Sequence, residues 1–164
     1  MHISYSAGKA SDGNVIRQEK ELLESMMRTQ ITSSRNHYLL SAKPSDFRDL
    51  MALGITDDYT MGYADHVGFR LGTAQCIRWI DPERFELTDL SLHPLVIMDR
   101  SLAEKQYMGL EKQASLNKIK SIYQSCQSVN GDFCVLFHNN VFRQGDYCWK
   151  DVYKEMINML CFDT

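Results

Sequence analysis

Two short apolar runs constrain the fold of this chain more than any other feature. Residues 94–99 and 132–138 are almost continuously apolar, and they end in Asp99 and His138. Strands of this kind are covered on both faces, as in a parallel sheet. Helical patterns separate the strand-like segments, so the sequence predicts an α/β fold with a largely parallel sheet, either open or wound as a barrel.

The remaining segments fit the same architecture. A turn at residues 82–85 between strand-like segments predicts a β-hairpin excursion. A capping-box pattern at Ser101 and Glu104 predicts the start of one helix, which is expected to break at Gly109. Apolar spacing predicts helices at 14–28, 44–53, 101–125 and 149–160, and strands at 31–34, 55–56, 76–81 and 87–92.

The composition and charge of the chain limit the kinds of partner that it can bind. With 164 residues, of which 44% are hydrophobic, the chain fits one globular domain spanning residues 1–164. The net charge of -3 and the lack of a basic patch disfavour nucleic acid and anionic membranes as partners. No segment reaches the roughly 18 apolar residues of a membrane-spanning helix, and the N-terminus does not resemble a signal peptide. A cytoplasmic location is therefore expected.

Polar residues gather after the predicted strands. Residues 57–73 combine acids, aromatics, three glycines, His66 and Arg70, a pattern typical of a substrate loop or of an ordinary surface loop. Arg35 and His37 follow another predicted strand, and His138 ends the last one. Active groups of α/β proteins collect at the carboxyl ends of strands. The five cysteines lack zinc-finger spacing and are expected to be reduced and mostly buried.

Four sequence motifs indicate more specifically what kind of protein this chain resembles. They are His2-Ile3-Ser4-Tyr5, residues 34–39 (Ser-Arg-Asn-His-Tyr-Leu), residues 58–73 with their Met-Gly-Tyr-Ala and Gly-Phe-Arg-Leu-Gly pieces, and Leu136-Phe137-His138-Asn139-Asn140. In order and rough spacing these motifs resemble a bacterial subfamily of the NodB-like polysaccharide deacetylases. The resemblance covers nearly the whole chain.

The resemblance implies an incomplete (β/α) barrel that hydrolyses N- or O-acetyl groups of a carbohydrate with a divalent metal, zinc or a similar ion. It places His2 at a metal-ligand position and His138 at the position of the general acid. Arg35 matches the arginine that orients the catalytic aspartate. The residues expected to line the sugar groove are His37, Tyr38, Asp57, Asp58, Asp65 and Arg70.

The sequence also departs from the family pattern. Ser6 stands where a second metal histidine is expected, and the acidic motif with the catalytic base would lie upstream of His2. We therefore expect a chain with little activity by itself, whose missing strands leave an open barrel edge that favours self-association. The alternative hypothesis is a remnant of the deacetylase fold that binds a carbohydrate or a protein without catalysis, and that needs no metal.

Overall fold

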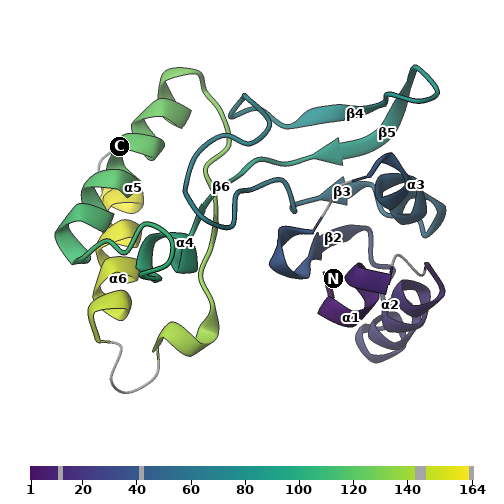
Figure 1. Ribbon diagram of the computed structural model, residues 1–164, viewed down its shortest axis with the longest axis horizontal. Coiled ribbons are helices and arrows are strands. Elements are labelled where there is room, and N and C mark those ends of the chain that lie inside the picture. The colour runs from purple at the N-terminus through teal and green to yellow at the C-terminus, as the bar shows by residue number, and fades with distance from the viewer. Residues whose placement is uncertain (11–12, 41–42, 143–146, 163–164) are drawn as a thin grey trace. The chain divides into compact units, whose positions relative to one another are not determined.

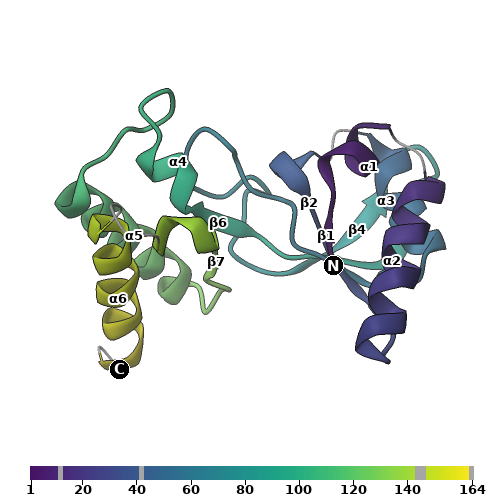
Figure 2. The ribbon, with the colours of Figure 1, turned by 90° about the horizontal axis from the view of Figure 1, so that it is seen from below.

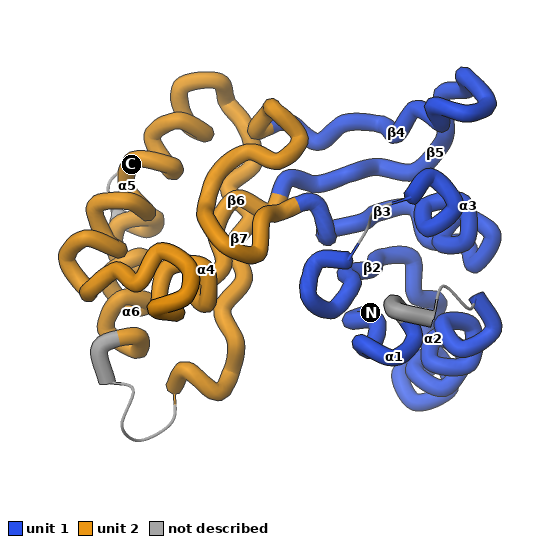
Figure 3. Tube along the Cα trace, in the orientation of Figure 1, with its two compact units in different colours: residues 1–61, 75–94 blue, residues 62–74, 95–164 orange. Residues whose placement is uncertain are grey.

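The computed structural model describes residues 1–10, 13–40, 43–142 and 147–162. The chain divides into two compact units, shown in Figure 3. Unit 1 comprises residues 1–61 and 75–94, and unit 2 comprises residues 62–74 and 95–164. The single domain expected from the sequence therefore consists of two units, each with its own sheet.

Unit 1 is built on a five-stranded sheet in the order β1-β2-β3-β5-β4 (Figure 1). Strands β1, β2, β3 and β5 are parallel, and β4 is antiparallel to β5 at the edge. The strands are β1 (His2–Ile3), β2 (Ser33–Asn36), β3 (Asp57–Asp58), β4 (Ile77–Asp81) and β5 (Glu86–Leu92). Figure 2 shows the helices α1 (Tyr5–Ala10), α2 (Gly13–Met27) and α3 (Pro44–Ala52) grouped beside these strands.

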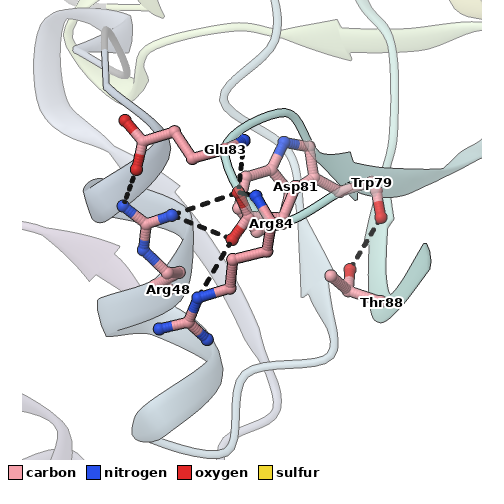
Figure 4. A network of polar contacts seen from close by, with 6 residues as sticks. All are labelled: Arg48, Trp79, Asp81, Glu83, Arg84 and Thr88. Atoms are coloured by element: carbon pink, nitrogen blue, oxygen red, sulfur yellow. Dashed lines mark hydrogen bonds and ion pairs between the residues drawn. The ribbon is translucent and has the colours of Figure 1, made fainter. Parts of the chain in front are cut away.

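The β4–β5 hairpin is fixed to α3 by an apolar and a polar contact. The rings of Phe47 and Trp79 lie 5.2 Å apart. Arg48 donates from Nη1 to both carboxylate oxygens of Asp81, at 3.1 and 2.8 Å, and from Nη2 to Glu83 at 2.6 Å (Figure 4). Because Asp81 is buried, its ion pair with Arg48 fixes the β4–β5 hairpin to α3 more firmly than an exposed ion pair would.

Unit 2 packs helices against a two-stranded parallel sheet of β6 (Leu95–Met98) and β7 (Cys134–Leu136). Helix α4 (Asp99–Ala103) follows β6 directly, and the 3-10 turn η2 (Asn139–Phe142) comes shortly after β7. Helices α5 (Lys112–Ser128) and α6 (Tyr147–Phe162) contact each other. The fully or almost fully buried core includes Val96, Ile97, Leu102, Ile119, Val152 and Met156.

The polar stretch at residues 57–73 is divided between the units. Residues 57–61 belong to unit 1, and the loop at 62–74 packs on β6 and α4 of unit 2. The backbone N–H of Gly68 donates to the Val96 carbonyl at 2.9 Å. Ser101 Oγ donates to the carbonyls of Tyr63 and Ala64, at 3.3 and 2.8 Å. The second half of this stretch is therefore built into unit 2 and is not a plain surface loop.

Gly62 allows this close packing, and Gly62→Ala is expected to destabilise unit 2. A Cβ atom at Gly62 would lie 2.7 Å from the Leu95 carbonyl oxygen and 2.9 Å from Leu95 Cβ. Leu95 is almost fully buried, so its backbone has little room to move. We expect a loss of about 1–3 kcal/mol in the free energy of unfolding, measured by urea denaturation. In Gly13→Ala the new Cβ has nothing within 4 Å, so this helical control should be neutral or slightly more stable.

Several expectations from the sequence are confirmed and others are wrong. The mixed α/β class, the largely parallel sheet and the hairpin are confirmed. The strands expected at 31–34 and 55–56 begin two residues later, at Ser33 and Asp57. The capping box at Ser101 is wrong, because α4 begins at Asp99 and Ser101 is buried inside it.

The strand pairing does not close a barrel within the described residues. None of the described helices is long and apolar enough to cross a bilayer.

Candidate functional site

A histidine and a buried aspartate meet where β6 and β7 end. Met98 and Leu136 are register partners at the carboxyl ends of these parallel strands. Asp99 and His138 therefore leave the sheet side by side, and His138 Nδ1 lies 2.6 Å from Asp99 Oδ1. The Asp99 side chain is fully buried, whereas 34% of the His138 side chain remains exposed.

The Asp99 carboxylate makes three hydrogen bonds, two of them with His138. Its Oδ2 accepts the His138 backbone N–H at 2.7 Å, and its Oδ1 accepts the Arg100 backbone N–H at 2.7 Å as well as the ring contact. A carboxylate can only accept hydrogen bonds, so the imidazole presents its Nδ1 proton to Asp99. The ring orientation is thereby fixed, and Nε2 is left to exchange a proton with a substrate.

Charged and polar side chains surround this pair. Arg100 donates to Glu104 Oε1 at 2.7 Å and to Asn140 Oδ1 at 3.1 Å. These contacts join α4 to η2, the turn that follows His138. Sequence reasoning selected His138 but missed Asp99. Part of the signal was present, because both residues end continuous apolar runs, but the sequence does not specify that these two strands pair in this register.

The sequence-predicted metal ligand lies in unit 1, in a cluster of rings at the ends of β1 and β2. The imidazoles of His2 and His37 are stacked, with centroids 4.8 Å apart and planes within 5°. His37 also contacts Tyr38, whose ring meets Tyr5 edge-on at 5.1 Å. Imidazole binds a metal through nitrogen lone pairs that lie in the ring plane, and parallel stacked rings do not direct these at one point.

The rest of the described chain offers no alternative metal site either. Across the part of the chain that the structure describes, no three His, Cys, Asp or Glu side chains form a group that could hold a metal ion. The side chains around His2 therefore do not fit the divalent metal that the resemblance implies.

Backbone strain marks the same ring cluster. Tyr38 and Leu39 both have a positive φ of 54°. This left-handed conformation is uncommon for residues other than glycine, and such residues concentrate at functional sites. It turns the chain directly after β2 and leaves Tyr38 66% exposed. His37 and Tyr38, both predicted to bind substrate, are thus brought together with His2.

A second polar cluster lies at the ends of β3 and β5. Arg35 Nε donates to the Tyr59 carbonyl at 3.1 Å. The Tyr59 ring stacks on His93 with centroids 4.2 Å apart. His93 Nε2 lies 2.8 Å from Asp57 Oδ1 and 3.8 Å from Cys76 Sγ. Of the residues predicted from the sequence, this cluster unites Arg35 and Asp57.

Three members of this cluster were missed by sequence reasoning. No pattern singled out Tyr59 or His93, and Cys76 was expected to be buried but is exposed. Cys161 is exposed as well, whereas Cys126 is buried as expected.

The contact between Asp57 and His93 predicts a pH-dependent stability. The hydrogen bond from His93, followed by that from Thr56, lowers the pKa of Asp57. A carboxyl group with a lowered pKa stabilises the fold above its unfolded pKa of about 4 and loses this contribution as the pH falls through the folded pKa. His93→Phe keeps a ring against Tyr59 but removes the donor. The stability difference between wild type and this variant should therefore narrow below about pH 4 in urea denaturation at stepped pH.

The matched control for this experiment is His66→Phe. It removes an exposed histidine whose Nδ1 lies 2.7 Å from Asp65 in unit 2. Unfolding of unit 1 should not change in this variant at any pH. A constant difference between wild type and His93→Phe from pH 2 to 7 would contradict the prediction.

The remaining predicted groove residues have different surroundings. Asp58 is fully buried, so its carboxylate lies away from the surface. Asp65 is exposed and pairs with His66, whose ring stacks on Tyr63 at 3.9 Å. Arg70 donates to the Gly62 carbonyl at 3.2 Å. Asp58 therefore does not line a surface groove, and Asp65 and Arg70 belong to unit 2, whereas His37, Tyr38 and Asp57 belong to unit 1.

Known proteins give no further identification. No protein-family model matches this chain, and no curated protein or solved structure shows a significant match to it.

Proposed function

We propose that this chain acts on acetylated carbohydrates, with His138 as the general acid that protonates the leaving group during acetyl hydrolysis. One observation supports this proposal above all others. The histidine that the resemblance selects from sequence motifs alone is half-exposed and held by a buried carboxylate. Many histidines at strand ends lack such a partner, so the geometry adds support that is independent of the motif.

In the proposed reaction, water adds to the acetyl carbonyl and loses one proton to solvent, and the bond from carbonyl carbon to nitrogen or oxygen then breaks. His138 Nε2 donates a proton to the departing amine or hydroxyl, acetate is released, and the proton on Nε2 is replaced from solvent. Asp99 stabilises the ring through Nδ1 and keeps Nε2 in place. We also propose that the fold is of the (β/α) barrel type that the resemblance implies.

Low activity is part of the proposal. The divalent metal of such enzymes polarises the carbonyl and activates water. Because the side chains around His2 do not fit this ion, His138 supplies proton transfer without that assistance. General acid–base catalysis alone contributes about 10²–10⁴-fold, which is a small part of the acceleration that enzymes typically achieve.

A second candidate function is binding of a carbohydrate without catalysis. The stacking of His2 on His37 favours it, because the rings at this strand end are arranged to contact a ligand through their faces and edges. The exposed ring of Tyr38 extends that surface. Carbohydrate rings pack on aromatic faces of this kind through their apolar C–H groups.

Acetate release from N-acetylchitotetraose and from an O-acetylated xylan fragment tests the proposal. We expect slow release by the purified chain that exceeds the rate of His138→Ala protein prepared in the same way. Equal rates for the two proteins would reject the catalytic proposal. Saturable binding of the oligosaccharide in that case would favour the second candidate. A parallel assay with added chelator shows whether a metal from solution contributes to the rate of acetate release.

A further inference from the structure

We infer that a pocket beside the Asp99–His138 pair is a subsite for a neutral sugar ring, with Trp149 as its aromatic wall. The inference rests on the proposed function and names the part of unit 2 that would hold the substrate. The pocket measures about 510 Å³ and is lined by Arg100, Glu104, Lys105, Gln106, Val141 and Trp149, among others. Its volume is within the range of small-ligand sites.

The lining combines an aromatic ring with several hydrogen-bonding groups. Trp149 packs partly against the core of unit 2, and another part of it faces the pocket. Arg100, Lys105 and Gln106 supply N–H donors, and Glu104 and Gln106 supply acceptors. A sugar ring presents apolar C–H faces and a rim of hydroxyl groups that both donate and accept. It therefore complements an indole wall surrounded by mixed polar groups.

The charges favour a neutral ligand. Arg100 is paired with Glu104 at 2.7 Å, so these two charges largely compensate each other. A second Arg100 nitrogen donates to Asn140, which fixes the guanidinium in place. Among the described residues of the lining, Lys105 carries the one remaining charge, and it is exposed to solvent. A strongly anionic ligand would therefore meet a single uncompensated positive charge from these residues.

The pocket and the catalytic pair share the same chain segments. Arg100 directly follows Asp99, and its backbone N–H donates to the Asp99 carboxylate. On the other side, the Val141 N–H donates to the His138 carbonyl at 3.2 Å. Residues that line the pocket are thus attached by backbone hydrogen bonds to both members of the pair, and we infer that the pocket positions the neighbouring part of an oligosaccharide for His138.

The two tryptophans of the chain allow a direct test, because Trp79 lies in unit 1 and Trp149 in unit 2. In Trp79→Phe protein the remaining indole fluorescence comes from Trp149. We expect N-acetylchitotetraose to change this emission saturably. By calorimetry on the otherwise wild-type chain, Trp149→Ala should weaken binding by at least about tenfold, the effect of losing a central aromatic contact.

Two further variants keep the inference falsifiable if Trp149→Ala fails to fold. Gln106→Ala removes an exposed side chain from the pocket and should weaken binding about threefold, which is typical of one hydrogen bond. Phe85→Ala is the control, because Phe85 is 88% exposed at the hairpin of unit 1. It should leave the affinity unchanged.

The outcomes separate this inference from the proposed function. Binding that Gln106→Ala and Trp149→Ala both weaken, without acetate release, supports the subsite and rejects the catalytic proposal. Acetate release that neither variant affects supports catalysis and overturns the subsite. Binding of a tetragalacturonate but not of N-acetylchitotetraose would overturn the assignment of a neutral sugar, as would the absence of a saturable change in Trp149 emission.

Discussion

Replacing His138 with alanine is expected to lower acetate release by about 10²–10⁴-fold, the usual contribution of a positioned general acid or base. The loss should appear in kcat and leave KM largely unchanged, because His138 is assigned to proton transfer and the sugar is assigned to a pocket beside it. Initial rates of acetate release by wild type and variant, followed over a range of substrate concentrations, measure kcat and KM.

Two comparisons distinguish a catalytic role of His138 from a structural one. Added imidazole should restore part of the activity of His138→Ala, because the deleted side chain leaves space next to the Asp99 carboxylate. Asp99→Asn should also lower kcat, since an amide that donates to Nδ1 would favour the wrong tautomer of the ring. Unchanged activity in His138→Ala would contradict the proposed role, and reduced activity without imidazole rescue would indicate a structural one.

Replacing Asp58 with alanine is expected to destabilise unit 1 by about 2–4 kcal/mol, because several buried donors would lose their acceptor. Asp58 Oδ1 accepts the Thr60 N–H at 3.0 Å, and Oδ2 accepts the hydroxyls of Thr60 and Ser34 at 2.8 Å each. The same Thr60 hydroxyl accepts the N–H of Asn36 at 3.0 Å. This network joins the ends of β2 and β3, where the polar stretch begins.

Asp58→Asn is the matched variant and should fold with a stability within about 1 kcal/mol of wild type, because at the same size the amide oxygen can accept the Thr60 N–H and the amide nitrogen can donate to the hydroxyl oxygens of Ser34 and Thr60. Burial raises the pKa of Asp58 despite the hydrogen bonds from Thr60 and Ser34. A carboxyl group with a raised pKa stabilises the fold most below its unfolded pKa of about 4, and this contribution is lost as the pH rises through the folded pKa.

The pH range from 4 to 7 therefore tests the assignment of Asp58. Wild type should lose stability relative to Asp58→Asn as the pH rises across this range. Urea denaturation followed by Trp79 emission in a Trp149→Phe background reports on unit 1. If the stability difference between wild type and Asp58→Asn does not change with pH, the pKa of Asp58 is not raised in the folded protein. An alanine variant as stable as wild type would show that the network does not stabilise unit 1.

Much of the fold could be predicted from local patterns. Apolar spacing located α2, α3 and α6 within a few residues, and the continuous apolar run at Leu95–Met98 correctly marked a buried strand. The hairpin followed from two strand-like segments around Pro82. The two-residue strand β1 and the short helix α1 were missed, because so few residues do not establish a period.

The candidate site was predicted only in part. His138 was identified by a motif and by its place after an apolar run, and Arg35 and His37 do lie at the carboxyl end of the parallel strand β2, whereas Asp57 begins β3. Asp58 was assigned to a sugar groove but is fully buried. Local sequence cannot distinguish neighbouring aspartates in a strand of two residues, whose side chains point to opposite faces of the sheet.

The sequence by itself determined the alternation of strands and helices and the polar residues that end the strands, because hydrophobic periodicity and turn chemistry act over short stretches of chain. Only the tertiary structure decided the pairing of Asp99 with His138, which are 39 residues apart, and the close approach of Gly62 to Leu95. These contacts depend on which strands become neighbours and in which register. The packing of whole units determines this pairing and register, and no short stretch of sequence specifies them.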